Sequence, residues 1–120
     1  MLTAVDMTEG KIRWQVPLGS MQDFGGKQPP VPPGSISLGG PIVTAGGLVF
    51  IAGTFDPFIR AFDIETGKEL WKAQLPDSGH ATPMTYMGKN KKQYVVIAAG
   101  GGTAIGNPHI SDSLIAFTLP

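Results

Sequence analysis

The sequence predicts an all-β protein built from antiparallel β-meander blades of a β-propeller. Short apolar runs alternate with turn residues, and no stretch has the apolar periodicity of a helix. A strand-and-turn unit recurs about every 55 residues, as in radially repeated sheets. The 17 glycines and 11 prolines lie mostly between the apolar runs, which is typical of a protein with many turns.

The apolar runs predict nine strands in the 120 residues. They span residues 2–6, 11–18, 41–44, 48–52, 58–64, 69–75, 83–87, 93–99 and 113–119. We expect one partial propeller domain with about two blades. Residues 1–18 would end one blade, residues 41–75 would form a full blade, and residues 83–120 an incomplete last blade. Residues 19–40 form a long loop rich in proline and glycine.

The stretch at residues 48–76 organises the chain because it holds three strands in under 30 residues. Residues 48–52 are rich in β-branched and aromatic residues, as in a buried strand. Residues 53–57 end that strand, since Pro57 cannot donate to a sheet ladder. Gly67 supplies the positive φ that a hairpin turn needs. Three strands so close together indicate a meander.

This unit occurs twice in full, and a truncated third copy lies at residues 114–120. The repeated residues are Asp6, Gly10, Lys11 and Trp14 in one copy and Asp63, Gly67, Lys68 and Trp71 in the other. A structural role is the simplest interpretation. The aspartate accepts from turn amides, the glycine permits the turn, and the flat indole covers the junction between sheets.

Composition excludes several classes of protein. The formal net charge is zero and only 15% of residues are charged, so no nucleic-acid surface is expected. Cysteine is absent, which excludes disulfides and thiol chemistry. The apolar runs are far shorter than the ~20 residues of a membrane helix. We expect neither a signal peptide nor a transmembrane segment within this sequence.

Strand polarity alternates in a meander, so the longer loops share one face. They span residues 19–40, 53–57, 76–82 and 100–112. Sites are usually built on such loops. Asp56 lies there, outside the repeated turn, either as an ordinary turn acid or as a carboxylate facing a substrate or cofactor. Arg60 either pairs with a nearby acid or faces water.

Gly100, Gly101 and Gly102 open the last of these loops. They permit close backbone approach to a ligand, or they form a flexible loop. No helix follows them, so they are not a phosphate-binding fingerprint. His80 and His109 lack a second ligand at metal spacing, and we expect solvated loop histidines and no metal site in this chain.

A resemblance to a known family rests on these residues. The pattern Ala-x-Asp-x-x-Thr-Gly-Lys-x-x-Trp at residues 61–71 resembles the tryptophan-docking motif of eight-bladed PQQ-dependent quinoprotein dehydrogenases. Residues 53–63, 81–86 and 92–101 are similar to late-blade sequences of that family, above all of membrane-bound glucose, polyol and quinate dehydrogenases. The resemblance implies a C-terminal propeller segment, with the remaining blades elsewhere.

The resemblance implies oxidation of a sugar, polyol or cyclic alcohol by PQQ with Ca²⁺ or Mg²⁺. Electrons would pass to ubiquinone on the periplasmic side of the bacterial inner membrane. Asp56 matches an active-site aspartate, and we assign Gly100, Gly101, Gly102 and Thr103 to cofactor binding. Several glucose dehydrogenases have a histidine where this chain has Gly102, which leaves substrates other than glucose open.

Two other interpretations stay open. One is a non-catalytic propeller scaffold, similar to an outer-membrane assembly lipoprotein with the same tryptophan-bearing repeat. It needs no acid at Asp56 and no glycine-rich loop. The other is a segment that is inactive alone, or that associates with other copies through its open sheet edges.

Overall fold

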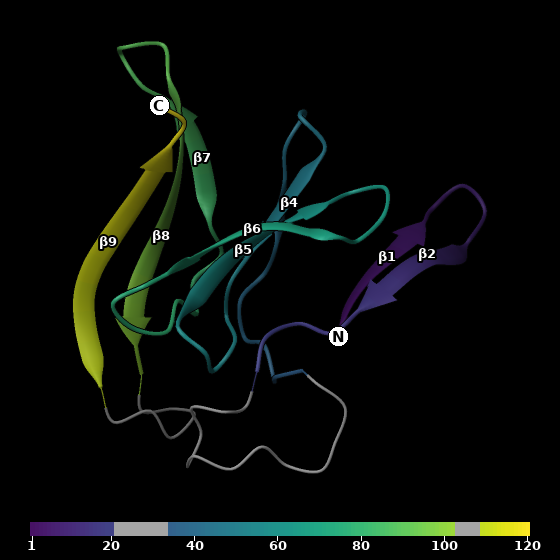
Figure 1. Ribbon diagram of the computed structural model, residues 1–120, viewed down its shortest axis with the longest axis horizontal. Coiled ribbons are helices and arrows are strands. Elements are labelled where there is room, and N and C mark those ends of the chain that lie inside the picture. The colour runs from purple at the N-terminus through teal and green to yellow at the C-terminus, as the bar shows by residue number, and fades with distance from the viewer. Residues whose placement is uncertain (21–33, 103–108) are drawn as a thin grey trace.

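The computed structural model describes residues 1–20, 34–102 and 109–120, which form three antiparallel sheets (Figure 1). The first sheet pairs β1 (Leu2–Asp6) with β2 (Lys11–Val16). The second has the order β3 (Ile42–Val43), β4 (Leu48–Ile51), β5 (Phe58–Asp63) and β6 (Glu69–Gln74). The third has the order β7 (Met84–Met87), β8 (Gln93–Gly101) and β9 (Ile110–Thr118). Strands adjacent in sequence are adjacent in each sheet, which confirms the predicted all-β meander.

The described ranges contain no helix, and therefore none that could cross a membrane. Each predicted strand is present, and most boundaries differ by no more than two residues. The third sheet holds the main error. β8 continues through Gly100 and Gly101, and β9 begins at Ile110. Gly100 and Gly101 therefore belong to a strand, whereas the sequence had placed them in a loop.

Backbone geometry at Gly101 explains this difference. The register between β8 and β9 shifts after Ala99, and Gly101 then pairs with Ile110. Gly101 has φ +61°, which an L side chain rarely adopts. The left-handed conformation of Gly101 accommodates the irregularity, so the ladder continues instead of ending.

Two clusters of buried apolar side chains hold the three sheets together. The first core lies between the first and second sheets and consists of Leu18, Val49, Ile51 and Phe62. The second core lies between the second and third sheets and consists of Ala52, Ile59, Leu75, Val95, Ile97 and Ala99. Alternate residues of β4 contribute to opposite cores, because successive side chains of a strand point to opposite faces. The second sheet is therefore covered on both faces.

Both tryptophans lie at the junctions between sheets, as the repeat predicted. Trp14 donates from Nε1 to the carbonyl of Ile64, 2.8 Å away in the second sheet. Trp71 contacts Phe50 and Phe117 edge to face, with centroid distances of 6.4 and 5.2 Å. Each indole thus joins its own sheet to the next one.

Asp6 and Asp63 are turn residues, as expected. Oδ1 of Asp63 accepts from the amides of Glu65 and Thr66 at 2.9 and 2.8 Å. These hydrogen bonds, led by that from the Thr66 amide, lower the pKa of Asp63. Amide hydrogen bonds likewise lower the pKa of Asp6 in the first turn. Both carboxylates therefore stabilise their turns in the charged form.

Candidate functional site

Loops from the second and third sheets meet at one edge of the molecule. Ser78 connects them. Its hydroxyl donates to the carbonyl of Phe55 at 3.2 Å, and its own carbonyl accepts from the amide of Gly101 at 3.0 Å. On the other side, the amide of Phe55 donates to Oγ of Ser35 at 3.0 Å. The loop that carries Asp56 is therefore fixed to the glycine-rich end of β8, as the shared loop face had predicted.

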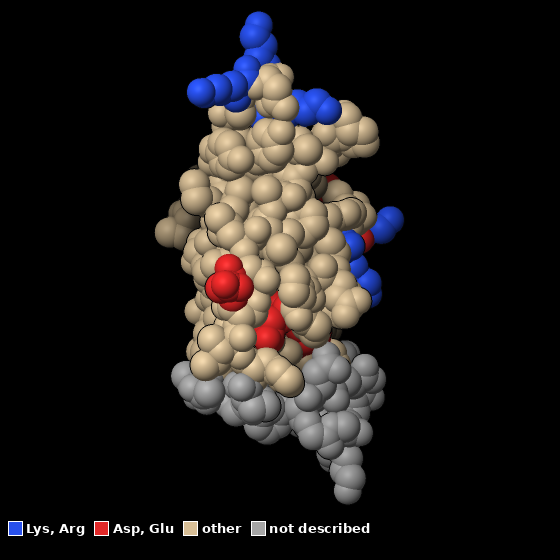
Figure 2. Space-filling model, turned by 90° about the vertical axis from the view of Figure 1, so that its left-hand side faces the viewer, with Lys and Arg blue, Asp and Glu red and all other residues tan. Residues whose placement is uncertain are grey.

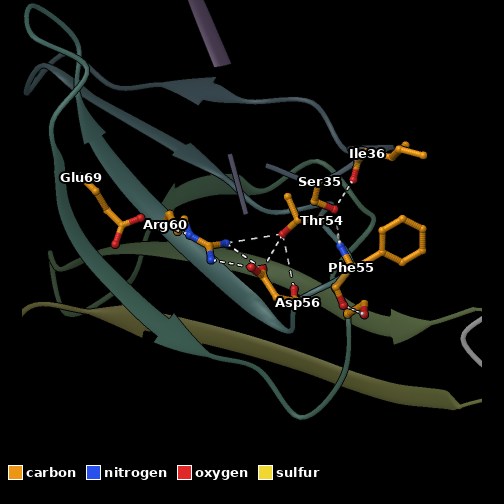
Figure 3. Close-up of polar contacts among 8 residues, drawn as sticks. Ser35, Ile36, Thr54, Phe55, Asp56, Arg60 and Glu69 are labelled. Carbon is orange, nitrogen blue, oxygen red and sulfur yellow. Dashed lines mark hydrogen bonds and ion pairs between the residues drawn. The ribbon is translucent and has the colours of Figure 1, made fainter. Parts of the chain in front are cut away.

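The carboxylate of Asp56 lies in a buried ion pair (Figure 3). Its two oxygens accept from Nη1 and Nη2 of Arg60 at 2.9 and 2.8 Å. Thr54 donates its hydroxyl to Oδ1 at 2.7 Å. Asp56 and Arg60 are only 4% and 7% exposed, so water screens this pair little. The sequence had left open whether Arg60 pairs or faces water, and the structure pairs it with Asp56.

Arg60 lies between two carboxylates. Its Nε is 3.2 Å from Oε2 of Glu69, on the neighbouring strand β6. Its guanidinium carbon also lies 5.4 Å from the centroid of the Phe58 ring. Three of its nitrogens are thereby fixed in direction, and Arg60 in turn fixes the orientation of the Asp56 carboxylate.

Local chain geometry explains why Asp56 and Arg60 meet. The amide of Phe58 donates to the carbonyl of Asp56 at 2.9 Å, which closes a tight turn around Pro57. This turn brings the Asp56 side chain back over β5, where Arg60 is held in the sheet by its pairing with Lys72. The arrangement gives a buried acid at the loop edge, and Arg60 holds its carboxylate in one orientation.

The glycine run offers space and few donors. The amide of Gly101 is bonded to Ser78, and that of Gly102 donates to the carbonyl of His109 at 3.0 Å. A Cβ atom at Gly101 would collide with the carbonyl of His109, whereas one at Gly102 would meet no atom of the described residues within 4 Å. Glycine at position 102 permits another group to approach the backbone closely. Thr103, also assigned to cofactor binding, lies outside the described residues.

Sequence reasoning missed three residues of this site: Thr54, Ser78 and Glu69. Single hydroxyls and an acid on another strand have no distinctive spacing, so no pattern could have selected them. The expectation of a solvated His80 was wrong. Both of its ring nitrogens are buried and have no hydrogen-bond partner among the described residues. His109 is exposed, as predicted.

Three packed meander sheets, joined by an indole that docks on the next sheet, define part of a β-propeller. A family model described as "PQQ: Glucose/ethanol/alcohol dehydrogenase, beta-propeller domain" matches residues 1–95. The chain belongs to this family of PQQ-dependent dehydrogenases.

Individual relatives agree with the family match. A probable quinate dehydrogenase (quinone) of Xanthomonas campestris pv. juglandis is 52% identical, over 99% of this chain and 15% of its own length. The quinate/shikimate dehydrogenase (quinone) of Acinetobacter baylyi is 48% identical, over 98% of this chain and 15% of its own. A europium-containing methanol dehydrogenase structure superimposes with a TM-score of 0.60 at 36% identity, covering 82% of this chain and 14% of that one. This chain thus spans about one-seventh of the proteins it matches.

PQQ and a metal ion are the two groups expected at the site, and the described residues differ in how well they fit each. At Gly102, a Cβ atom would meet no described atom within 4 Å, so the described residues do not obstruct a flat organic cofactor such as PQQ there. For a metal ion, residues 1–20, 34–102 and 109–120 contain no group of three His, Cys, Asp or Glu side chains. The Asp56 carboxylate is already paired with Arg60. The described residues are therefore compatible with a PQQ molecule beside Gly102, and they provide no set of metal ligands.

Proposed function

We propose that this chain is a propeller segment of a PQQ-dependent dehydrogenase that oxidises a sugar, polyol or cyclic alcohol. Ubiquinone would accept the electrons at the periplasmic side of the bacterial inner membrane. The observation that carries the proposal is the Ser78 link, which holds Asp56 and Gly101 at one edge of a chain of this family. Relatives named for quinate, together with Gly102 in place of a histidine, favour a cyclic polyol as substrate.

Bound PQQ would supply an electrophilic quinone that accepts a hydride from the alcohol carbon, and this hydride carries both electrons of the oxidation. In our proposal, Asp56 binds and orients the substrate. Its Oδ1 accepts from both Thr54 and Arg60, whereas Oδ2 accepts only from Arg60 among the described residues. A carboxylate oxygen accepts two hydrogen bonds, so Oδ2 retains capacity for a substrate hydroxyl.

The other residues position this acid and the cofactor. Arg60 and Thr54 prevent the Asp56 carboxylate from rotating. Ser78 fixes the distance between the Asp56 loop and the end of β8. In our proposal the cofactor approaches the glycine run from the side of Gly102, with Gly100 and Gly101 holding that backbone in the strand, and Thr103 contributes a hydroxyl to cofactor binding. Ca²⁺ or Mg²⁺ would be held by other blades.

Asp56→Asn in a complete dehydrogenase that contains this segment tests the proposal. Reduction of a ubiquinone analogue would be measured with quinate, glucose and glycerol after loading with PQQ and Ca²⁺ or Mg²⁺. We expect kcat to fall by about 100-fold, the effect that a misplaced substrate can have. Asp63→Asn, which changes a turn acid of the repeat, is the matched control and should retain activity. Normal turnover by Asp56→Asn would refute the assigned role.

Calorimetric titration of PQQ with Ca²⁺ or Mg²⁺ into the 120-residue chain addresses the segment itself. Light scattering would report its mass in the same samples, because open sheet edges invite association between copies. Micromolar binding by an oligomer would mean that copies rebuild a cofactor site. A monomer without binding would mean that the site requires the other blades.

A further inference from the structure

The turn between β7 and β8 carries a cluster of positive charge. Lys89, Lys91 and Lys92 lie within four residues, and all three are exposed. The sequence contains no Asp or Glu between Asp77 and Asp112. Figure 2 shows basic side chains gathered at this end of the molecule, whereas the acidic side chains of that face lie lower. Among the described residues, none of the three lysines pairs with a carboxylate.

This turn, which we call the lysine turn, has a defined shape. The amide of Gly88 donates to the carbonyl of Lys92 at 2.8 Å, and the amide of Lys91 donates back to Gly88 at 2.9 Å. The side chain of Asn90 accepts from the amide of Lys92 at 3.2 Å and donates to the hydroxyl of Tyr94 at 2.9 Å. The lysines therefore project from a fixed base.

Turn geometry does not explain why a lysine occupies position 91. Lys91 has φ 62°, and no other described non-glycine residue has a positive φ. Glycine or asparagine adopts this conformation at lower cost than a long side chain. A residue kept in a disfavoured conformation is a reason to look for a function of its side chain.

The end of β7 beside the lysine turn exposes an aromatic residue on one face of the sheet and an apolar residue on the other. Met87 is 66% exposed and Tyr86 is 45% exposed. The ring of Tyr86 stacks on Tyr94, with centroids 5.2 Å apart and planes 12° apart. Tyrosine rings with a polar tip are enriched where proteins meet the lipid headgroup layer. Lysine and tyrosine together match such an interface.

We propose that the lysine turn docks on an anionic membrane surface and binds the phosphate groups of its lipids. The formal net charge of the chain is zero, so attraction would come from this local cluster. Charge alone would attract an acidic protein equally well. The exposed Met87 and Tyr86 favour a lipid surface. The lysine turn and Gly101 lie at opposite ends of β8, so docking leaves the candidate site free. This inference does not depend on the proposed activity.

Sedimentation of the 120-residue chain with vesicles tests the proposal. Phosphatidylglycerol vesicles present anionic lipid, and phosphatidylcholine vesicles measure the apolar contribution alone. At about 0.1 M salt, the triple variant Lys89→Gln, Lys91→Gln, Lys92→Gln should bind the anionic vesicles about 100-fold more weakly, because each lysine contributes about fivefold. Its matched control, Lys11→Gln, Lys68→Gln, Lys72→Gln, loses the same charge elsewhere and should change binding by no more than about twofold.

A single substitution distinguishes the loss of charge from disruption of the turn. Lys91→Asn suits the left-handed conformation, so the turn should remain intact while binding weakens about fivefold. Equal binding by the triple variant and its control would overturn the proposal, as would binding that is insensitive to salt. A soluble polyglutamate peptide is included in parallel. If it binds the chain while anionic vesicles do not, the partner is an acidic polypeptide and the lipid proposal is wrong.

Discussion

The indole ring of Trp14 occupies the space that a side chain at Gly67 would need. A Cβ atom on Gly67 would lie 2.6 Å from Cε3 of Trp14. Trp14 belongs to the first copy of the repeat and Gly67 to the second, so the second copy provides a surface for the tryptophan of the copy before it. The glycine in the repeat therefore has two separate roles, turn geometry and sheet docking.

Gly67→Ala should destabilise the chain by about 3 kcal/mol. About 1 kcal/mol comes from forcing an L residue to φ +71°, and the remainder from overpacking against the indole. Urea denaturation, followed by tryptophan fluorescence, measures the loss. The emission of Trp14 should also shift as the ring leaves its site.

Gly10→Ala is the matched control for this prediction. Gly10 holds the same repeat position and has φ +65°, but a Cβ there would meet none of the described atoms within 4 Å. Only the backbone cost of about 1 kcal/mol should remain. Equal destabilisation by both variants would contradict docking of Trp14 on Gly67 as a stabilising contact.

The sequence alone predicted the three sheets because their signals are local. Strand alternation, turn glycines and the repeated tryptophan each occur within a few residues. The end of β8 was not predictable in this way. A run of glycines predicts the end of a strand. Only the pairing of Gly101 with Ile110 shows that the ladder continues through an irregularity.

The candidate site was predictable only in outline. Alternating strand polarity placed Asp56 and the glycine run on one face. Their connection depends on Ser78, a single hydroxyl between strands, and on a tight turn that directs Asp56 towards Arg60. Such contacts depend on the three-dimensional path of loops, which periodicity does not determine.

Arg60→Met should destabilise the chain by about 3–5 kcal/mol, because it leaves the buried Asp56 carboxylate without its partner. Urea denaturation would measure the free energy of unfolding. Lys72→Met is the matched control. Lys72 is exposed, lies opposite Arg60 in the ladder and is also 5.4 Å from the Phe58 ring, yet its loss should cost less than about 0.5 kcal/mol.

A double substitution distinguishes the ion pair from simple packing. Asp56→Asn combined with Arg60→Met removes both charges, so the double variant should be less destabilised than the Arg60→Met variant alone. If the two effects instead add, the carboxylate gains no measurable stability from the guanidinium. The bidentate contact would then matter only for orientation.

Gly101→Ala should strongly disrupt the third sheet, whereas Gly100→Ala should be tolerated. At Gly101, a Cβ would collide with the carbonyl of His109 and the backbone has positive φ. At Gly100, the nearest atom to a Cβ would be the Ser111 carbonyl oxygen at 3.6 Å, an ordinary contact. Hydrogen exchange at the Gly101 amide, which donates to the Ser78 carbonyl, would report the disruption of the sheet. Comparable protection in both variants would contradict the proposed continuation of β8.

Acid should loosen the turn that Asp63 stabilises. The amide of Thr66, then its hydroxyl, lower the pKa of Asp63 from 3.8, so the charged form is favoured by folding. Its stabilisation is complete above the unfolded value and is lost as pH falls through the lower, folded value. Hydrogen exchange at the Thr66 amide should therefore accelerate, beyond its intrinsic pH dependence, only below about pH 4. Asp63→Asn cannot titrate and should abolish that extra dependence, and its persistence in this variant would assign the effect to another group.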